Sequence, residues 1–335
     1  MKKENSVPSH TSTSRNFYHN FPRSRLNGSR EEMIQTGQAI LQSIKKIGLI
    51  LVPEIVEWKQ PLQDGSFRTV LIKQNRISFT ELSQVEVKEH GRFFGPFAIE
   101  FSVDVLRKLG AMPVIYIPQN LKDDNKYSAV GSTIVAQLND IKYTINQLHI
   151  LSQLANPEHI LKTVPDAKSI SDDFLIHLSN TDPSNAVVQS SAVSMKCVNN
   201  ILSYIEYRNA PFDLMVGVLS HIQNLFYPTD NDRHDSLLEY YRQREWRLLP
   251  NLKVDNTMQA RPLTNSEKDY VISMDVSFWS KAQSYENKSF RRIDDVSVID
   301  MFNGTHISEL ISSVIVPEES LNFARDIFGE KAIIL

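Results

Sequence analysis

The hydrophobic and polar positions in the first third of the chain alternate with a period of two, which predicts strands. Apolar β-branched and aromatic residues mark short strands at 77–82, 97–101 and 113–117. Between the first two strands, the glycines and the proline of 90–96 predict a tight loop. Residues 16–21 interrupt a polar stretch and predict an earlier strand. Polar side chains within these strands and this loop are expected to lie beside a pocket.

Two sharper local signals accompany these strands. An Asp-Gly pair at 64–65 predicts the turn of a hairpin that covers 58–70. Ser29, with Glu32 three residues later, predicts a capping box that opens a helix, and Gly48 is expected to end that helix. The chain therefore begins as a strand, a helix and a hairpin.

The apolar spacing changes to a helical period in the middle of the chain. Apolar residues four and three positions apart in 134–148 predict a helix with one buried face, and the same stripe also suits a short coiled-coil dimer. Further helices are predicted at 192–207 and, apolar on most sides, at 212–226. The remaining predicted elements are a short helix near 174–178, strands at 244–249 and 311–316, and a last helix from 318.

Together these elements predict an α+β protein with strands at both ends of the chain around a helical block. We expect Phe79, Ile99, Ile115 and Trp246 to belong to one sheet. The predicted organisation is a flexible tail at 1–15, an N-terminal α+β part at 16–131, a helical insertion at 132–228 and a C-terminal part at 229–335 that completes the sheet.

Composition narrows the class of protein. Apolar residues make up 41% and charged residues 22% of the 335 residues, a normal globular balance. The net charge of −3 gives no general sign of a nucleic-acid partner, and it leaves room for a local basic patch. No apolar run reaches membrane length and no signal peptide is evident, so the expected location is cytoplasmic with no membrane partner. The single cysteine, Cys197, lies in an apolar stretch and is expected to be a buried, inert thiol.

The strong motifs of phosphate loops, dinucleotide folds, zinc proteases and nucleophile elbows do not occur in the sequence. The nine histidines are scattered without ligand spacing, so no metal site is expected. The best candidate for chemistry lies on the predicted strand that contains Gln243 and Glu245. Residues two apart on a strand point to the same face, so these two side chains would project together.

Four ordered pieces of the chain resemble the AbiGi-type family of abortive phage infection proteins. Three of them are the Ser-Phe-Thr-Glu-Leu run at 78–82, the His-Gly-Arg-Phe-Phe-Gly-Pro-Phe-Ala-Ile-Glu-Phe run at 90–101 and the Gly-Ala-Met-Pro-Val-Ile-Tyr run at 110–116. The fourth is the acidic-Trp-Arg element within 240–247. The resemblance implies the antitoxin half of a two-component abortive-infection pair.

The Gln-Arg-Glu tripeptide that ends at Glu245 is also similar to the catalytic strand of ADP-ribosyltransferases. That resemblance implies a split β-sheet frame with an inserted helical block, and NAD as a cofactor. Glu245 would hold the nicotinamide ribose and stabilise the oxocarbenium ion, and Gln243 would orient the acceptor. It also implies cofactor contacts from Tyr18 and His19 on the first strand. Ser78 and Thr80 on the later strand, together with Phe94, complete the candidate cofactor-binding residues.

A structural interpretation accompanies each of these roles. In the structural interpretation, Glu245 is a charge on the sheet face that pairs with an arginine, with Trp246 packed inward. His90 is either a hydrogen-bonded loop histidine or a catalytic group of the pocket. The arginines near Glu245 either contact phosphates or form a solvated strand edge.

Two functions remain open from the sequence. The first is a phage-defence antitoxin or regulator that binds a protein partner such as a toxin or a phage component. The second is an active ADP-ribosyltransferase that transfers ADP-ribose from NAD to a nucleic-acid or protein acceptor. The resemblance to the antitoxin family favours the first function.

Overall fold

The computed structural model describes two compact units, one of Met1–Ser132 with Asn224–Leu335 and one of Thr133–Gln223. The described residues are 15–23, 29–62, 64–118, 130–155, 175–179, 190–194, 197, 200–201, 212–229, 244–250, 253–254, 257–258, 260–285 and 288–334. The tail predicted at 1–15 lies outside them except for Arg15.

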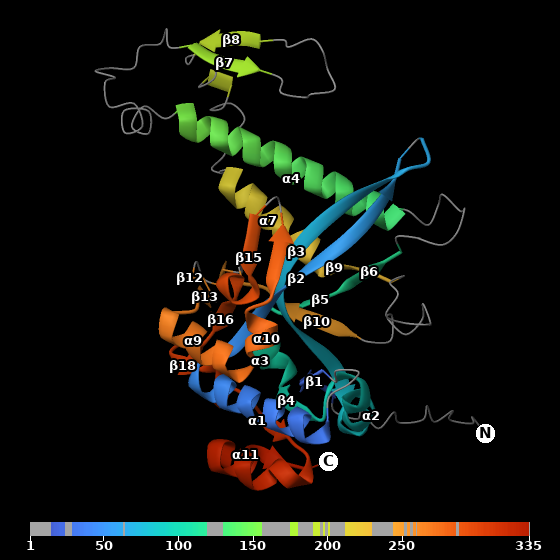
Figure 1. Ribbon diagram of the computed structural model, residues 1–335, viewed down its shortest axis with the longest axis vertical. Helices are drawn as coiled ribbons and strands as arrows, with labels where there is room; N and C mark the ends of the chain where they lie inside the picture. Colours follow the sequence, from blue (N-terminus) through green and yellow to red (C-terminus); the bar gives the residue numbers. More distant parts are fainter. Residues whose placement is uncertain are drawn as a thin grey trace, which may run out of the picture. The chain divides into compact units, whose positions relative to one another are not determined.

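The first unit is built on a mixed sheet, which confirms an α+β fold (Figure 1). Within the described residues its main path runs β13-β16-β2-β3-β1-β4-β19-β20, and β10 joins it by pairing with β3 and with β5. All pairs are antiparallel except β19 with β20. The strands are β1 (Arg15–Phe21), β2 (Leu49–Pro61), β3 (Phe67–Ser83), β4 (Phe97–Phe101), β5 (Met112–Pro113), β10 (Glu245–Leu248), β13 (Arg261–Pro262), β16 (Ser297–Ile299), β19 (Ser313–Ile315) and β20 (Ala332–Ile333).

Strand β3 is the centre of this sheet. Its first part forms the predicted hairpin with β2, and the turn is closed by the backbone N–H and hydroxyl of Ser66, which both donate to Asp64. Its last part pairs at Thr80 with both Tyr18 of β1 and Glu245 of β10. Because one residue can pair only once at each edge, β1 and β10 flank opposite edges of β3 there. Side chains directly opposite one another share a face, so Tyr18, Thr80 and Glu245 form one row.

Helix α1 (Arg30–Lys46) covers part of this sheet and begins with the predicted capping box of Ser29 and Glu32. Gly48 follows it with φ +124°, as expected of a helix stop. Helix α11 (Leu321–Phe328) lies against α1 (Figure 1). The other helical elements of this unit are α3 (Val103–Lys108), α9 (Asn265–Met274), α10 (Val276–Trp279), η2 (Arg292–Asp295), η3 (Ile307–Glu309), η4 (Glu318–Ser320) and η5 (Gly329–Lys331).

Aromatic side chains fill the main core of the first unit. Phe79 meets Phe101 edge to face, and Phe17 meets Trp246 in the same way, so β1, β3, β4 and β10 share one packed face. A smaller cluster lies around Val271, Ile293 and Val298.

Short two-stranded pairs complete the unit: β6 (Ile115–Ile117) with β9 (Phe226–Pro228), β11 (Lys253–Val254) with β12 (Thr257–Met258), β14 (Ala282–Tyr285) with β15 (Lys288–Arg291), and β17 (Met301–Phe302) with β18 (Thr305–His306).

The loop predicted at 90–96 is wrong, because most of it belongs to helix α2 (Gln84–Phe94). Glu86 accepts hydrogen bonds from the backbone N–H and the hydroxyl of Ser83 at the start of this helix, at 2.7 and 2.8 Å. Gly91 lies inside the helix at a cost of about 1 kcal/mol relative to alanine. Gly95, with φ +118°, ends it. The start signal at Ser83 therefore outweighs the single interior glycine.

The expectation of a common sheet holds for Phe79, Ile99 and Trp246, and it is wrong for Ile115. After Pro113 the chain makes one more backbone bond, from Val114 N–H to the carbonyl of Glu245 at 2.9 Å, and then pairs with β9 instead. Proline at an edge position ends pairing easily, because it has no N–H to donate.

The second unit contains most of α4 (Val130–Ala155) and α7 (Phe212–Leu225), with the hairpin of β7 (Leu175–Ser179) and β8 (Ser190–Ser194). The short helix predicted near 174–178 is wrong, because residues 175–178 pair with β8. The helix predicted from residue 192 cannot begin there, because β8 runs to Ser194. Cys197 is exposed, so the expected core thiol is also wrong. Within the described residues, no helix combines the length and the apolarity needed to cross a membrane.

Candidate functional site

A cleft of about 330 Å³ opens in the first unit above the last part of β3. Most of the residues singled out in the sequence lie on its wall, although their roles stay predictions. We call it the polar cleft. It is lined by Tyr18, His19, Asn20, Arg23, Ile50, Val52, Glu54, Arg76, Ile77, Ser78, Thr80, His90, Phe94, Tyr227, Glu245 and Arg247.

Glu245 has hydrogen-bond donors on both carboxylate oxygens. The hydroxyl of Ser78 donates to Oε1 at 2.5 Å, and Nε of Arg247 donates to the same oxygen at 3.0 Å. The hydroxyl of Tyr116 donates to Oε2 at 2.6 Å. The side chain is 13% exposed, so these bonds are largely shielded from water.

The charges around Glu245 set its protonation. Burial by itself opposes the charged form, but Arg247 and Arg76, helped by the hydroxyls of Ser78 and Tyr116, outweigh burial and hold the pKa of Glu245 at about 2. The carboxylate is therefore ionised at every physiological pH. Burial, and next the negative charge of Glu245, raise the pKa of Tyr116, so its phenol stays a donor.

A layer of cation and aromatic groups lies behind the carboxylate. The guanidinium of Arg247 is fully buried and also donates to Gln74 and to the carbonyl of Asn224, at 3.2 and 2.7 Å. Arg76 forms an ion pair with Glu54. The guanidinium groups of Arg247 and Arg76 lie 5.1 and 5.3 Å from the ring centre of Tyr227. Glu245 is thus part of a packed charge network, as its structural interpretation predicted.

A second hydrogen-bonded group lies across the cleft on α2 and β1. Nδ1 of His90 is 2.9 Å from Oδ1 of Asn20, and its Nε2 is 3.2 Å from the hydroxyl of Thr80. The ring stacks on Phe94 with centroids 4.3 Å apart. Burial, and then the neighbouring His19, lower the pKa of His90 to about 4, so the ring is neutral at pH 7.

The two candidates on β1 are more deeply placed. Nδ1 of His19 lies 2.7 Å from the carbonyl of Ser78, so this nitrogen carries the proton. The ring stacks near Phe21, and burial lowers the pKa of His19. Burial, and next Glu100, raise the pKa of Tyr18, whose side chain is buried.

The cleft brings together seven of the eight predicted site residues, and the eighth, Gln243, lies outside the described residues. Sequence reasoning missed Arg76 and Tyr227, and it gave Tyr116 no contact with Glu245. Arg247 was noted among the arginines near Glu245, and its position two residues later on a strand could have paired it with that glutamate. Tyr116 and Tyr227 gave no such signal, because only the tertiary fold brings them to Glu245 and its arginines.

The side chains of the polar cleft are a poor match for two kinds of ligand, a metal ion and NAD. In the part of the chain that the structure describes, no cluster of His, Cys, Asp and Glu could hold a metal ion. A ribose hydroxyl would have to compete with Ser78, Tyr116 and Arg247 for the carboxylate of Glu245. A carboxylate neutralised by two arginines is also a weak stabiliser of a developing cation. The residues therefore fit the catalytic use of NAD poorly.

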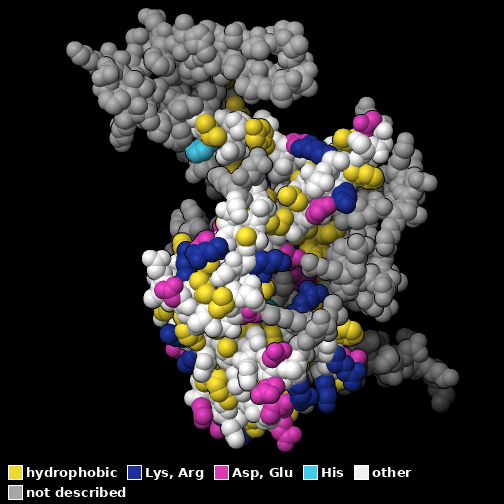
Figure 2. Space-filling view, viewed as in Figure 1, with side chains coloured by type: hydrophobic (Ala, Val, Ile, Leu, Met, Phe, Trp, Pro, Cys, Tyr) yellow, Lys and Arg dark blue, Asp and Glu magenta, His cyan; other side chains and the backbone are white. Residues whose placement is uncertain are grey.

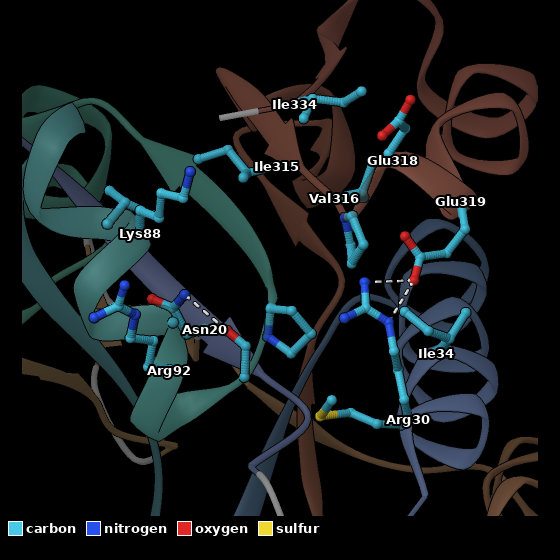
Figure 3. A pocket seen from close by; sticks show the side chains of 16 residues that line it. Asn20, Arg30, Ile34, Lys88, Arg92, Ile315, Val316, Glu318, Glu319 and Ile334 are labelled. Atoms are coloured by element: carbon cyan, nitrogen blue, oxygen red, sulfur yellow. Dashed lines mark hydrogen bonds and ion pairs between the residues drawn. The ribbon is translucent and has the colours of Figure 1, made fainter.

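A second hollow of about 510 Å³ lies on the other side of α2. We call it the α2 groove. Lys88 and Arg92 extend from α2 on one wall, and Arg30 of α1 bonds to Glu319 at the other, with Ile315 between them (Figure 3). On the face in Figure 2, basic and acidic side chains of the described residues are interspersed, without a large basic patch.

These observations define an α+β protein whose polar cleft holds a largely shielded glutamate that pairs with Arg247. The sequence model of one protein family, described as "Putative abortive phage resistance protein AbiGi, antitoxin", matches residues 68–296, and the chain belongs to that family. The matched range includes α2, β10 and all of β3 but its first residue, and with them most of the residues that line the polar cleft. No curated protein and no solved structure matches the chain.

Proposed function

We propose that this protein acts in abortive phage infection as an antitoxin that neutralises a protein partner by binding it. Membership of the antitoxin family supports the role. The hydrogen-bonded carboxylate of Glu245 supports binding over catalysis, because three donors within the protein already engage it.

The observation that carries the proposal is the exposed apolar surface of α2. Val85 is 83% exposed and Phe93 is 71% exposed, the highest values among the large hydrophobic side chains that the structure describes. At about 100° per residue they lie within roughly 80° of each other around the helix. Lys88 and Arg92 of the α2 groove are on the same helix (Figure 3). Exposed apolar side chains rimmed by charge are typical of protein-binding surfaces.

The test replaces the two exposed apolar side chains of α2, Val85 and Phe93. The probe is any product of a neighbouring gene that is toxic when expressed alone. In the double variant Val85→Ser and Phe93→Ser, we expect loss of binding to that toxic protein, and loss of growth rescue when the two are coexpressed. Val276→Ser is the matched control, because Val276 is 60% exposed on a different helix. Full rescue by the folded double variant would exclude α2 as the docking surface. Failure of the wild type to bind or rescue would exclude the antitoxin function itself.

A second candidate is an ADP-ribosyltransferase-like frame with activity toward NAD and a protein or nucleic-acid acceptor. The observation in its favour is that Tyr18, His19, Ser78, Thr80, His90, Phe94 and Glu245 line one cleft. When bound, NAD would supply the ADP-ribosyl group, Phe94 would offer a flat wall and Ser78 and Thr80 would offer hydroxyls. The neutralised carboxylate of Glu245 opposes this candidate.

Nicotinamide release from NAD by the purified wild type separates the two functions. We expect none, with or without a protein or nucleic-acid acceptor. Release that disappears in Thr80→Val and in Glu245→Gln, with both variants still folded, would instead establish the transferase. Because the measurement begins with the wild type, loss of stability in a variant does not obscure it.

A further inference from the structure

Three side chains of the polar cleft form a hydrogen-bond chain whose direction is set by chemistry. The amide of Asn20 donates through Nδ2 to the carbonyl of Gly95 at 3.2 Å, a bond drawn in Figure 3. A carbonyl can only accept, so the amide nitrogen must face Gly95. The oxygen Oδ1 then faces Nδ1 of His90 at 2.9 Å.

The same reasoning continues through the imidazole. An amide oxygen only accepts, so Nδ1 of His90 must carry the proton. The ring is neutral, because burial and His19 lower the pKa of His90. Nε2 is therefore a lone-pair acceptor, and the hydroxyl of Thr80 at 3.2 Å must be the donor. Each hydrogen bond in this series therefore has one defined donor: the hydroxyl of Thr80 donates to the imidazole of His90, which donates to the amide of Asn20.

The surroundings hold this chain in place. Thr80 lies on β3 between two paired strands, and its side chain forms part of the cleft wall. The ring of His90 is stacked on Phe94, with centroids 4.3 Å apart. A hydroxyl bonded to a base that a third group orients is the arrangement of an activated nucleophile.

We propose that Thr80 is an activated nucleophile, with His90 as its general base and Asn20 as the positioning residue, and that the cleft takes a small acyl ester. This proposal goes beyond the antitoxin function and does not depend on it. Apolar side chains of Ile50, Val52 and Phe94 line the cleft beside the triad. Arg23, whose guanidinium lies 5.6 Å from the ring centre of Phe94, supplies positive charge on the same wall for the oxyanion of the tetrahedral intermediate.

The step balances within these groups. Oγ1 of Thr80 forms a bond to the ester carbonyl carbon while its proton passes to Nε2 of His90. The bond from that carbon to the alcohol oxygen then breaks, and His90 returns the proton to the leaving alcohol. Water then attacks the acyl carbon while His90 takes a proton from it. The bond from that carbon to Oγ1 of Thr80 breaks, and His90 returns the proton to Oγ1, which releases the acid.

Diisopropyl fluorophosphate tests the nucleophile directly on the full chain. Oγ1 of Thr80 would bond to phosphorus as the phosphorus–fluorine bond breaks, and the proton would leave with fluoride through His90. We expect one adduct, located on Thr80 by mass spectrometry of peptides. Thr80→Val should abolish it, and Thr80→Ser should retain it.

The base and the positioning residue give readouts that a purely structural role would not move. His90→Gln should slow the labelling of Thr80 by about 100-fold or more. Asn20→Leu should slow it as well, with Thr80 still the labelled residue. Thr36→Val, which removes a hydroxyl on α1 that bonds to its own helix, should label at the wild-type rate.

Two results would overturn the proposal. One is a wild type that stays unlabelled while a serine hydrolase in the same tube is fully labelled. The other is labelling of Thr80 at an unchanged rate in folded His90→Gln. If either cleft variant fails to fold, Thr80→Ser still decides, because loss of its adduct would contradict an activated hydroxyl at this position.

Discussion

Glu245 and Arg247 point to the same face of β10, and Nε of Arg247 donates to Oε1 of Glu245 at 3.0 Å. The arginine side chain is 0% exposed and the glutamate side chain 13%. A pair that is hidden to this degree differs from a surface ion pair, because neither charge can return to water when its partner is removed.

Glu245→Gln should therefore destabilise the protein. The amide leaves the buried charge of Arg247 uncompensated, and we expect the free energy of unfolding to fall by about 3 kcal/mol. Urea denaturation measures this change. Glu57→Gln is the matched control, because Glu57 pairs with Lys59 at the same spacing on β2 with both side chains exposed. Its expected cost is below about 1 kcal/mol, and equal costs for the two variants would contradict the prediction.

The stability of the protein should depend on acid in a defined range. The pKa of Glu245 is lowered from 4.5 to about 2 in the folded state. A lowered carboxyl pKa contributes stability above the unfolded value, and that contribution is lost as pH falls from 4.5 toward 2. At about 1.4 kcal/mol for each pKa unit, the loss amounts to about 3 kcal/mol.

Thermal melts of the wild type and of Glu245→Gln between pH 6 and pH 2.5 measure this contribution. The difference between the two proteins should shrink as the solution becomes more acidic. A difference that stays constant over the whole range would show that folding does not shift the pKa of Glu245.

Gly95→Ala should be much more harmful than Gly65→Ala. Both glycines have positive φ, +118° and +83°, so both variants carry backbone strain. A Cβ at residue 95 would lie 2.3 Å from the carbonyl oxygen of Pro22, whereas one at residue 65 would meet nothing within 4 Å. We expect Gly95→Ala to cost about 1–3 kcal/mol more in unfolding free energy. Similar melting temperatures would mean that the backbone at Pro22 can move aside.

Glu86→Ala should loosen the start of α2. The carboxylate caps Ser83 and also accepts from Arg244 at 2.8 Å, so the substitution removes both contacts. We expect a loss of about 1 kcal/mol or more, measured by thermal denaturation. Glu89→Ala is the control on the same helix, where the pair with Arg92 is exposed and should cost less than about 0.5 kcal/mol. A larger loss of stability in Glu89→Ala than in Glu86→Ala would contradict the role of Glu86 at the start of α2.

The local parts of the fold were predictable from the sequence. The capping box at Ser29, the stop at Gly48 and the hairpin turn after β2 each depend on a few neighbouring residues, and all three are confirmed. Helix α2 was missed because the glycines and the proline of 90–96 indicated a loop, and the start signal of Ser83 and Glu86 was not recognised. The strand β7 was missed because its partner β8 decides its state, which a short window of sequence does not contain.

The sequence predicted which polar residues belong to the candidate site, but it did not predict how they bond to one another. Glu245 and Ser78 were singled out because polar groups inside apolar strands are unusual. Their relationship depends on the pairing of β10 with β3, and the hydroxyl of Tyr116 and the charge of Arg76 reach Glu245 only in the folded chain. The sequence therefore located the cleft residues and left open whether the carboxylate is free or paired.

The place of β10 also has a consequence for synthesis on the ribosome. Glu245 lies 167 residues after Ser78, so residues 77–80 of β3 emerge long before β10 covers their second edge, whereas β2 already pairs with residues 67–76. At about 5–20 residues per second, that edge stays open for roughly 10 to 30 seconds in each nascent chain. An uncovered edge strand can pair with other chains during this interval. The cell's chaperones would thus meet this protein first as an unfinished sheet, and its yield should be sensitive to the rate of translation between β3 and β10.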